Sequence, residues 1–207
     1  MDARFSTPPG GHAVVYDALM WPLERTALGA WRRRLAAGAR GRVLEIGTGT
    51  GAQLAWYAPG TRVTALEPDA GMLARARRRA TRAAASVTVV EGRAEELPFA
   101  DAGFDAAVSA FALCTVADPA AALAEVRRVL VPGGTLQLLE HVHLPWEPGR
   151  ALQSRAAPAW ASVAGGCRLD RDTLRSAREA GFVVVSARTH VAGWVVQASL
   201  RAPSTGA

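Results

Sequence analysis

The amino-acid sequence predicts an α/β fold, a doubly wound seven-stranded sheet with an antiparallel final strand. Two observations lead to this prediction. Short runs of β-branched and aliphatic residues alternate with segments of helical periodicity, an order typical of parallel strands joined by helices. The last two runs are separated only by a few residues around 190–193, too few for a parallel crossover, so they should form an antiparallel hairpin.

The strand-like runs come in the order that such a sheet needs. They cover residues 42–46, 63–66, 87–90, 104–109, 134–139, 183–188 and 194–200. The helix before the fifth run is the clearest, because Asp118 suits its N-cap, Pro119 its first position and Pro132-Gly133-Gly134 its end.

Length and composition indicate one compact domain. The chain has 207 residues, half of them hydrophobic, which suffices for a core without metals or disulfides. We expect the domain over residues 1–200, with an N-terminal helical cover at about 10–38, a substrate-cover insertion at about 143–168 and a flexible tail at 201–207. No apolar run reaches the roughly 18 residues that span a bilayer, and the N-terminus lacks a signal-peptide core, so we expect a cytoplasmic protein.

The net charge of +6 comes from 24 arginines and 18 acids. An arginine cluster follows the second strand, at Arg75, Arg77, Arg78, Arg79 and Arg82. Because no aromatic residues interleave with these arginines, we interpret them as a solvated helix face and expect no nucleic acid as partner. Two cysteines, Cys114 and Cys167, are too few for a metal or disulfide framework, so we expect free thiols and no metal.

Residues 43–52 read V-L-E-I-G-T-G-T-G-A, the pattern of a buried strand, a tight turn and then a helix. Gly47, Gly49 and Gly51 remove Cβ atoms where a ligand would approach the backbone, and the helix N-terminus would offer unpaired N–H groups. The loop therefore predicts a site for a nucleotide-like cofactor.

The neighbouring acids decide between two cofactors, because the loop also satisfies the looser G-x-G-x-x-G/A dinucleotide pattern. The carboxylate of Glu45 would repel a pyrophosphate but suits a cationic or amino-bearing ligand, which favours S-adenosylmethionine over NAD. Glu67, at the end of the second strand, could accept hydrogen bonds from both ribose hydroxyls of either cofactor.

Four ordered blocks carry a resemblance to a known family: V-L-E-I-G-T-G-T-G, A-L-E-P-D, E-G-R-A-E-E-L-P-F-A-D-A-G-F-D and E-V-R-R-V-L-V-P-G-G-T-L. Over nearly the whole chain, they resemble the class I S-adenosylmethionine-dependent methyltransferases. The resemblance implies a Rossmann-like fold, S-adenosylmethionine as methyl donor and S-adenosylhomocysteine as product.

Shorter segments narrow the resemblance: F-A-L-C-T-V, L-L-E-H-V, A-P-A-W and G-G-C, between residues 111 and 167. They are similar to the small-molecule thiol methyltransferases of the mammalian methyltransferase-like group and their bacterial relatives. Bacterial phospholipid N-methyltransferases and quinone C-methyltransferases share most of the core blocks. The mammalian thiol enzymes carry a hydrophobic N-terminal anchor that we do not expect here, so only transient membrane contact is considered.

Ligands of such sheets bind outside the carboxyl ends of the strands. We therefore expect cofactor contacts from Glu45, Gly47, Thr48, Gly49, Gly51, Glu67, Pro68, Met72, Arg93, Ala94, Ser109 and Leu113. The resemblance adds Tyr16 near the methionine end of the cofactor. Arg93 departs from the family, because many relatives have an acid there and arginine cannot accept from the adenine amino group; the Ala94 backbone would then read the base. Met72 could equally be ordinary core packing.

Two segments outside the core could cover the acceptor, the N-terminal helix and residues 143–168. The candidate pocket residues are His12, Phe111, Cys114, Trp146, Trp160 and Cys167. Proline- and tryptophan-rich insertions at this edge suggest a lidded apolar pocket. The alternative is that the tryptophans only fasten a helix to the sheet.

Methyl transfer is an in-line displacement at a sulfonium, so the enzyme chiefly aligns the groups and excludes water. A thiol ionises near neutral pH, whereas an alcohol needs a strong base, which favours a small apolar thiol as acceptor. His141 is the candidate for orienting the acceptor or removing its proton, unless it is a structural histidine. Nothing adjacent in sequence would activate Cys114 as a nucleophile. Amines, phospholipid headgroups and quinols remain alternative acceptors. Outside the methyltransferases, an NAD-binding oxidoreductase and a non-catalytic cofactor-binding module remain alternative functions.

Overall fold

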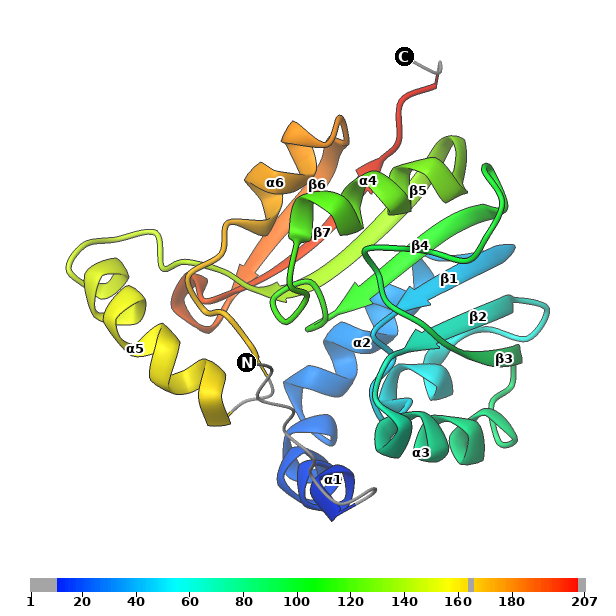
Figure 1. Ribbon diagram of the computed structural model, residues 1–207, viewed down its shortest axis with the longest axis horizontal. Coiled ribbons are helices and arrows are strands. Elements are labelled where there is room, and N and C mark those ends of the chain that lie inside the picture. The colour runs from blue at the N-terminus through cyan, green and yellow to red at the C-terminus, as the bar shows by residue number, and fades with distance from the viewer. Residues whose placement is uncertain (1–10, 164–165, 205–207) are drawn as a thin grey trace, which may run out of the picture.

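A computed structural model of the protein describes residues 11–163 and 166–204, with a seven-stranded sheet at its centre (Figure 1). The strands are β1 Arg42–Ile46, β2 Arg62–Glu67, β3 Ser86–Glu91, β4 Phe104–Ala110, β5 Leu130–His141, β6 Val183–His190 and β7 Val195–Arg201. Each of the seven expected runs forms a strand, and most extend one or two residues beyond the expected bounds.

The strands are arranged in the order β3-β2-β1-β4-β5-β7-β6. The five strands β1 to β5 run parallel, whereas β7 is antiparallel to both β5 and β6. The doubly wound sheet with an antiparallel final strand is therefore confirmed. The chain reverses its direction of winding between β1 and β4, and this switch point is where ligands of open α/β sheets bind.

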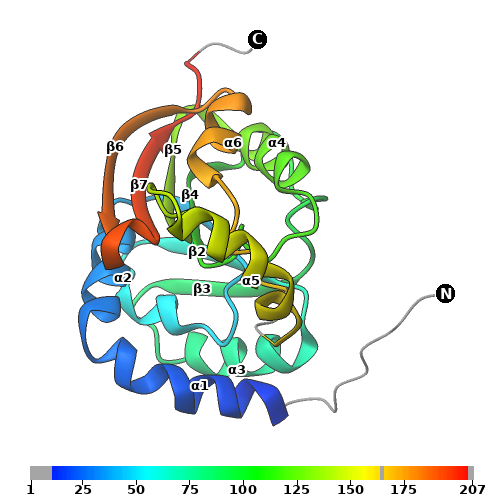
Figure 2. The same cartoon turned by 90° about the vertical axis from the view of Figure 1, so that its left-hand side faces the viewer.

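Helices cover both faces of the sheet. They are α1 Gly11–Glu24, α2 Ala27–Ala37, η1 Ala52–Trp56, α3 Ala70–Ala80, α4 Pro119–Val129, α5 Gly149–Val163, α6 Thr173–Glu179 and η2 Val191–Gly193. One core lies under α4 and α6, and a second lies under α2, η1 and α3, with α1 packed against α2 and α3 (Figures 1 and 2). The helix α5 stands beyond the carboxyl ends of the parallel strands (Figure 1).

The helix expected after the glycine turn is short. It is the five-residue 3₁₀ helix η1, which begins after Gly51 in the left-handed conformation (φ +85°). It ends at Trp56, because Tyr57 already has extended backbone angles, and a Pro59-Gly60 turn then leads into β2. The N-terminus offered to a ligand is therefore that of a short 3₁₀ helix.

The helix α4 begins as expected. The Asp118 side chain caps it by accepting hydrogen bonds from the N–H groups of Ala120 and Ala121. Its end was expected at Pro132-Gly133-Gly134, but the helix stops at Val129 and the chain enters β5 at Leu130, which already has extended backbone angles. In the described part of the chain, no helix combines the length and apolar character needed to cross a membrane.

Candidate functional site

The strand ends expected to hold a ligand meet at one edge of the sheet. Ile46, at the end of β1, is in register with Leu66 of β2 and Ser109 of β4. Ser109 is in turn in register with Leu138 of β5. The loops that follow these four strands therefore lie side by side at the switch point.

The three glycines after β1 have different roles. A Cβ on Gly47 would lie 2.5 Å from the Ala112 side chain, and one on Gly51 would lie 3.1 Å from Cα of Ala76 in α3. These two positions need glycine because neighbouring segments approach closely. Gly49 also has a positive φ of +58°, but a Cβ there would meet no described atom within 4 Å. The space over Gly49 is therefore the part of the loop that can receive a ligand.

Glu67 connects this loop to the end of β2. One of its carboxylate oxygens accepts from the Gly49 N–H at 2.8 Å and the other from the Asp69 N–H at 3.0 Å. Burial raises the pKa of the Glu67 carboxyl. A carboxylate has about four lone-pair sites, so two remain for the hydroxyls of a ligand.

Glu45 lies buried beneath the loop, at 2% exposure. Its Oε1 accepts a 2.6 Å hydrogen bond from the Thr48 hydroxyl. Its Oε2 makes no hydrogen bond of standard geometry with a described residue, although the buried Tyr57 hydroxyl also interacts with this carboxyl and lowers its pKa. Burial raises the pKa of Glu45 to about 7, against the opposing effect of the Thr48 hydrogen bond. A buried oxygen of this kind suits a hydrogen-bond donor such as a ligand amino group.

Asp17 fastens the helix α1 to the loop, a role that sequence reasoning missed. One Asp17 oxygen accepts from the Thr50 hydroxyl at 2.7 Å, and the other from Arg75 Nε at 2.7 Å. Arg79 of α3 pairs with the same carboxylate at 3.0 Å. Two arginines of the cluster are therefore bound to α1, while Arg77 and Arg78 remain exposed.

Glu140 organises the loop after β4, a second role that sequence reasoning missed. It is fully buried and accepts from the Ser109 hydroxyl at 2.6 Å. The N–H groups of Ala112, Leu113 and Cys114 also donate to it, at 3.1 to 3.2 Å. Burial raises the pKa of Glu140, and these four donors offset part of the cost of burying a carboxylate.

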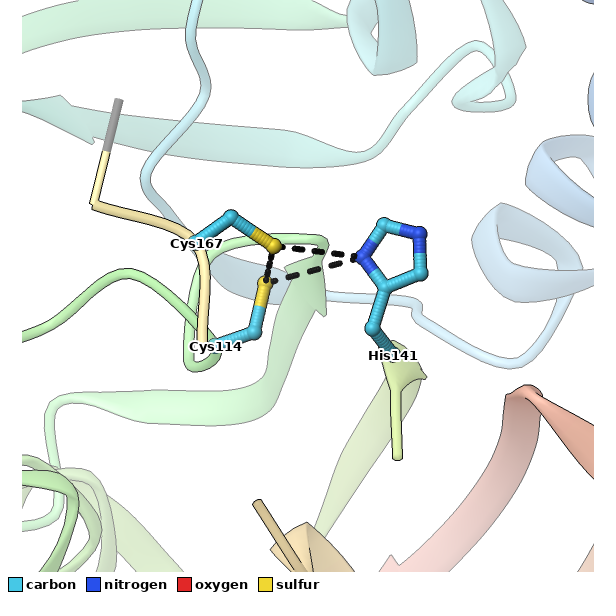
Figure 3. A group of neighbouring side chains, drawn as sticks. All are labelled: Cys114, His141 and Cys167. Carbon is cyan, nitrogen blue, oxygen red and sulfur yellow. Dashed lines mark hydrogen bonds between the residues drawn. The ribbon is translucent and has the colours of Figure 1, made fainter. Parts of the chain in front are cut away.

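His141 lies next to this carboxylate, beside both cysteines. Its Nδ1 is 3.5 Å from Cys167 Sγ and 3.9 Å from Cys114 Sγ, and the two sulfurs are 3.5 Å apart (Figure 3). The rings of Phe111 and Trp194 flank His141, with centroids at 4.7 and 5.6 Å. The structure thus supplies Cys114 with a neighbouring imidazole that the sequence did not reveal.

The two thiols differ in acidity. The hydrogen bond with Cys114, followed by the contact with His141, lowers the pKa of Cys167 to about 5. The hydrogen bond with Cys167 and complete burial raise the pKa of Cys114. Of the pair, Cys167 is therefore the more acidic thiol.

The other expected residues are less closely assembled. Pro68 is exposed and Met72 half-buried, while Ala94 is buried next to exposed Arg93, which pairs with Glu95 at 3.5 Å. Trp160 is 41% exposed and helps to lower the pKa of Cys167. Trp146 is 51% exposed and packs against Gly149 at the start of α5. The side chains of His12 and Tyr16 lie outside the described part of the structure.

Known proteins share these motifs and this topology. A family model described as a methyltransferase domain matches residues 44–138. The thiol S-methyltransferase TMT1B of Homo sapiens is 36% identical over 151 residues, which cover 70% of this chain and 62% of that protein. The demethylmenaquinone methyltransferase of Renibacterium salmoninarum is 39% identical over 159 residues, which cover 72% of this chain and 65% of that protein.

A solved structure shows the same fold. It is described as an S-adenosylmethionine-dependent methyltransferase of Thermotoga maritima, a possible histamine N-methyltransferase. The TM-score is 0.69 at 25% identity, and the match covers 92% of this chain and 97% of that one. The chain spans about three fifths of the length of the thiol S-methyltransferases TMT1B of Homo sapiens and Rattus norvegicus.

Proposed function

Because the chain belongs to the class I S-adenosylmethionine-dependent methyltransferases, we propose that it transfers a methyl group from S-adenosylmethionine to a small apolar acceptor, with a thiol preferred. One observation carries this proposal. The space over Gly49 is open, and the carboxylate of Glu67 closes one side of it with hydrogen-bonding capacity to spare.

The residues at the strand ends fit this cofactor. Glu67 would hold its ribose hydroxyls, and Glu45 would hold the amino group of its methionine end with Oε2, the oxygen that does not accept from Thr48. The open space over Gly49 would admit the cofactor against the backbone. When bound, S-adenosylmethionine supplies an electrophilic methyl group on a sulfonium. The protein then has to align the acceptor with that methyl group and keep water away.

The surroundings of His141 support an apolar acceptor. The rings of Phe111 and Trp194 both lie against its ring, and both belong to the apolar cluster around the two cysteines. A thiol acceptor needs little help to ionise, which matches a site with few polar groups beyond His141. The similarity to the human thiol S-methyltransferase supports the same class of acceptor. His141 would orient this acceptor.

A quinol is the second candidate acceptor. The demethylmenaquinone methyltransferase relative is slightly more similar in identity than the human thiol enzyme, over a similar length. Aromatic side chains such as Phe111 and Trp194 would also stack on a quinol ring. The two acceptors therefore have to be compared directly.

The test is S-adenosylhomocysteine release by the purified protein with matched series of thiols, quinols and amines. We expect turnover with apolar thiols and, within that series, an apparent pKa of kcat/KM that follows the acidity of the thiol. The variant His141→Ala tests whether His141 orients the acceptor. Its matched control is His143→Ala, two positions further along, where the ring contacts Ser154 at 3.3 Å. Release with quinols but not thiols would reassign the acceptor, and no release with any acceptor would favour a non-catalytic cofactor-binding module.

A further inference from the structure

Three side chains of the kinds that can bind metals come from distant segments and converge beside the carboxyl end of β5. Cys114 comes from the loop after β4, His141 ends β5, and Cys167 follows α5. Figure 3 shows the two sulfurs and Nδ1 of the imidazole pointing toward one another. Their ligand atoms all lie within 4.8 Å of one another.

The distances in this cluster match one face of a tetrahedral zinc site. Zinc binds thiolate sulfur at about 2.3 Å and imidazole nitrogen at about 2.0 to 2.1 Å, so tetrahedral geometry places two sulfurs about 3.8 Å apart and sulfur about 3.6 Å from nitrogen. The structure has 3.5 Å between the sulfurs, and 3.5 and 3.9 Å from the sulfurs to Nδ1 of His141. We propose that Cys114, His141 and Cys167 form a Zn²⁺ site, a role that does not depend on the proposed methyl transfer.

The charge of the cluster suits a divalent cation. Two thiolates and a neutral imidazole would balance Zn²⁺, so no net charge would be buried in the apolar surroundings of Phe111 and Trp194. Two side chains of opposite charge lie beside the cluster. Glu140 is bound to the backbone of Cys114, and Arg171 is bound to the backbone of Leu113.

The backbone holds the ligands in place before any metal binds. The Cys114 N–H donates to Glu140, and its carbonyl accepts from the Arg168 N–H at 2.8 Å. The Arg171 guanidinium donates to the carbonyls of Leu113 and Val116. These contacts join the segments of both cysteines, and such fixed geometry reduces the entropy that metal binding costs.

Three protein ligands leave one of four tetrahedral positions for an exogenous group. Zinc sites with three protein ligands keep this position for water or a substrate, whereas structural sites fill all four from the protein. Sulfur ligands favour further soft ligands, so a small thiolate is the class of molecule that this position would accept.

The site is tested on the full chain after reduction and chelation, by titrating Zn²⁺ against a chromophoric chelator. We expect one Zn²⁺ per chain, and a loss of affinity greater than about 100-fold in Cys114→Ser and Cys167→Ser, since even second-shell changes cost about 10- to 100-fold. His143→Ala is the matched control and should bind like the wild type. Far-UV circular dichroism and thermal unfolding show whether each variant is folded.

Cobalt provides a measurement that needs no variant. Co²⁺ in the wild-type site should show intense thiolate-to-metal charge transfer and the strong visible bands of tetrahedral coordination. A wild-type protein that takes up no Zn²⁺, a folded Cys167→Ser variant that binds as tightly as the wild type, or a Co²⁺ spectrum without thiolate bands would each overturn the proposal. Formation of a Cys114–Cys167 disulfide in a protein that binds no Zn²⁺ once reduced would also overturn it and identify a redox pair.

Discussion

The main-chain N–H of Gly49 donates to Glu67 Oε2 over 2.8 Å, which ties the loop after β1 to the end of β2. The same carboxylate holds the Asp69 N–H, at the position that caps α3. One acid therefore fixes two chain segments around the open space over Gly49. Residues at this junction should affect ligand affinity more than residues elsewhere on the sheet edge.

Gly49→Val should abolish S-adenosylhomocysteine binding while the protein still folds. The new side chain would meet no described atom within 4 Å of its Cβ, so it would occupy the space left for the ligand. The positive φ of +58° should lower the free energy of unfolding by about 1 to 2 kcal/mol. Calorimetry measures the affinity for S-adenosylhomocysteine, and thermal unfolding measures the loss of stability.

The matched control is Gly60→Val, in the turn before β2. Gly60 also has a positive φ, +84°, and a Cβ there would also meet nothing within 4 Å. This variant should lose similar stability and keep its affinity. If Gly49→Val binds S-adenosylhomocysteine as tightly as Gly60→Val, the loop is not the cofactor site.

Glu67→Ala should weaken S-adenosylhomocysteine binding by about 1 to 3 kcal/mol, the usual range for losing hydrogen bonds to a charged acceptor. Stability should fall as well, because the N–H groups of Gly49 and Asp69 lose their acceptor. Glu91→Ala is the control, an exposed acid in register with Glu67 on the neighbouring strand. NADH should not bind the wild type; tight NADH binding would revive the oxidoreductase alternative.

Asp17→Ala should release the N-terminal cover. The Thr50 hydroxyl and two arginines of α3 lose a shared, largely buried acceptor, so S-adenosylhomocysteine affinity should fall by about 1 to 3 kcal/mol. Hydrogen exchange should accelerate in α1 and in the loop around Thr50. The control is Asp101→Ala, which breaks an exposed ion pair with Arg128. It should change neither the S-adenosylhomocysteine affinity nor the rate of hydrogen exchange in α1. Unchanged exchange in α1 would show that the Asp17 contacts do not hold the cover.

The fold and the glycine loop could be predicted from the sequence because their signals are local. A strand, a glycine turn and an N-cap such as Asp118 are each encoded within a few neighbouring residues. Even there, the sequence did not specify that the helix after β1 would be the five-residue 3₁₀ helix η1.

The Glu140 network and the Cys114–His141–Cys167 cluster could not be predicted in this way. Glu140 lies 26 to 31 residues from its partners, which are brought to it by the register between β4 and β5. Cys167 lies 53 residues from Cys114, and the two meet only after α5 folds back over the strand ends. Hydrophobic periodicity does not specify register between strands or the path of a long insertion.

Glu45 should make stability depend on pH. Its folded pKa of about 7 lies above the ordinary value of 4.5, so between these values the folded protein keeps a proton that the unfolded chain has released. The free energy of unfolding should therefore fall as pH rises through this window, by up to about 3 kcal/mol, and level off above it.

The variant Glu45→Gln tests this prediction. It keeps the acceptor for the Thr48 hydroxyl but cannot titrate, so its free energy of unfolding should change less with pH. The pKa values of Glu67 and Glu140 are also raised, but both residues remain in both proteins, so the difference isolates Glu45. Urea unfolding across the window measures the two curves, and parallel curves would show that Glu45 titrates normally in the folded state.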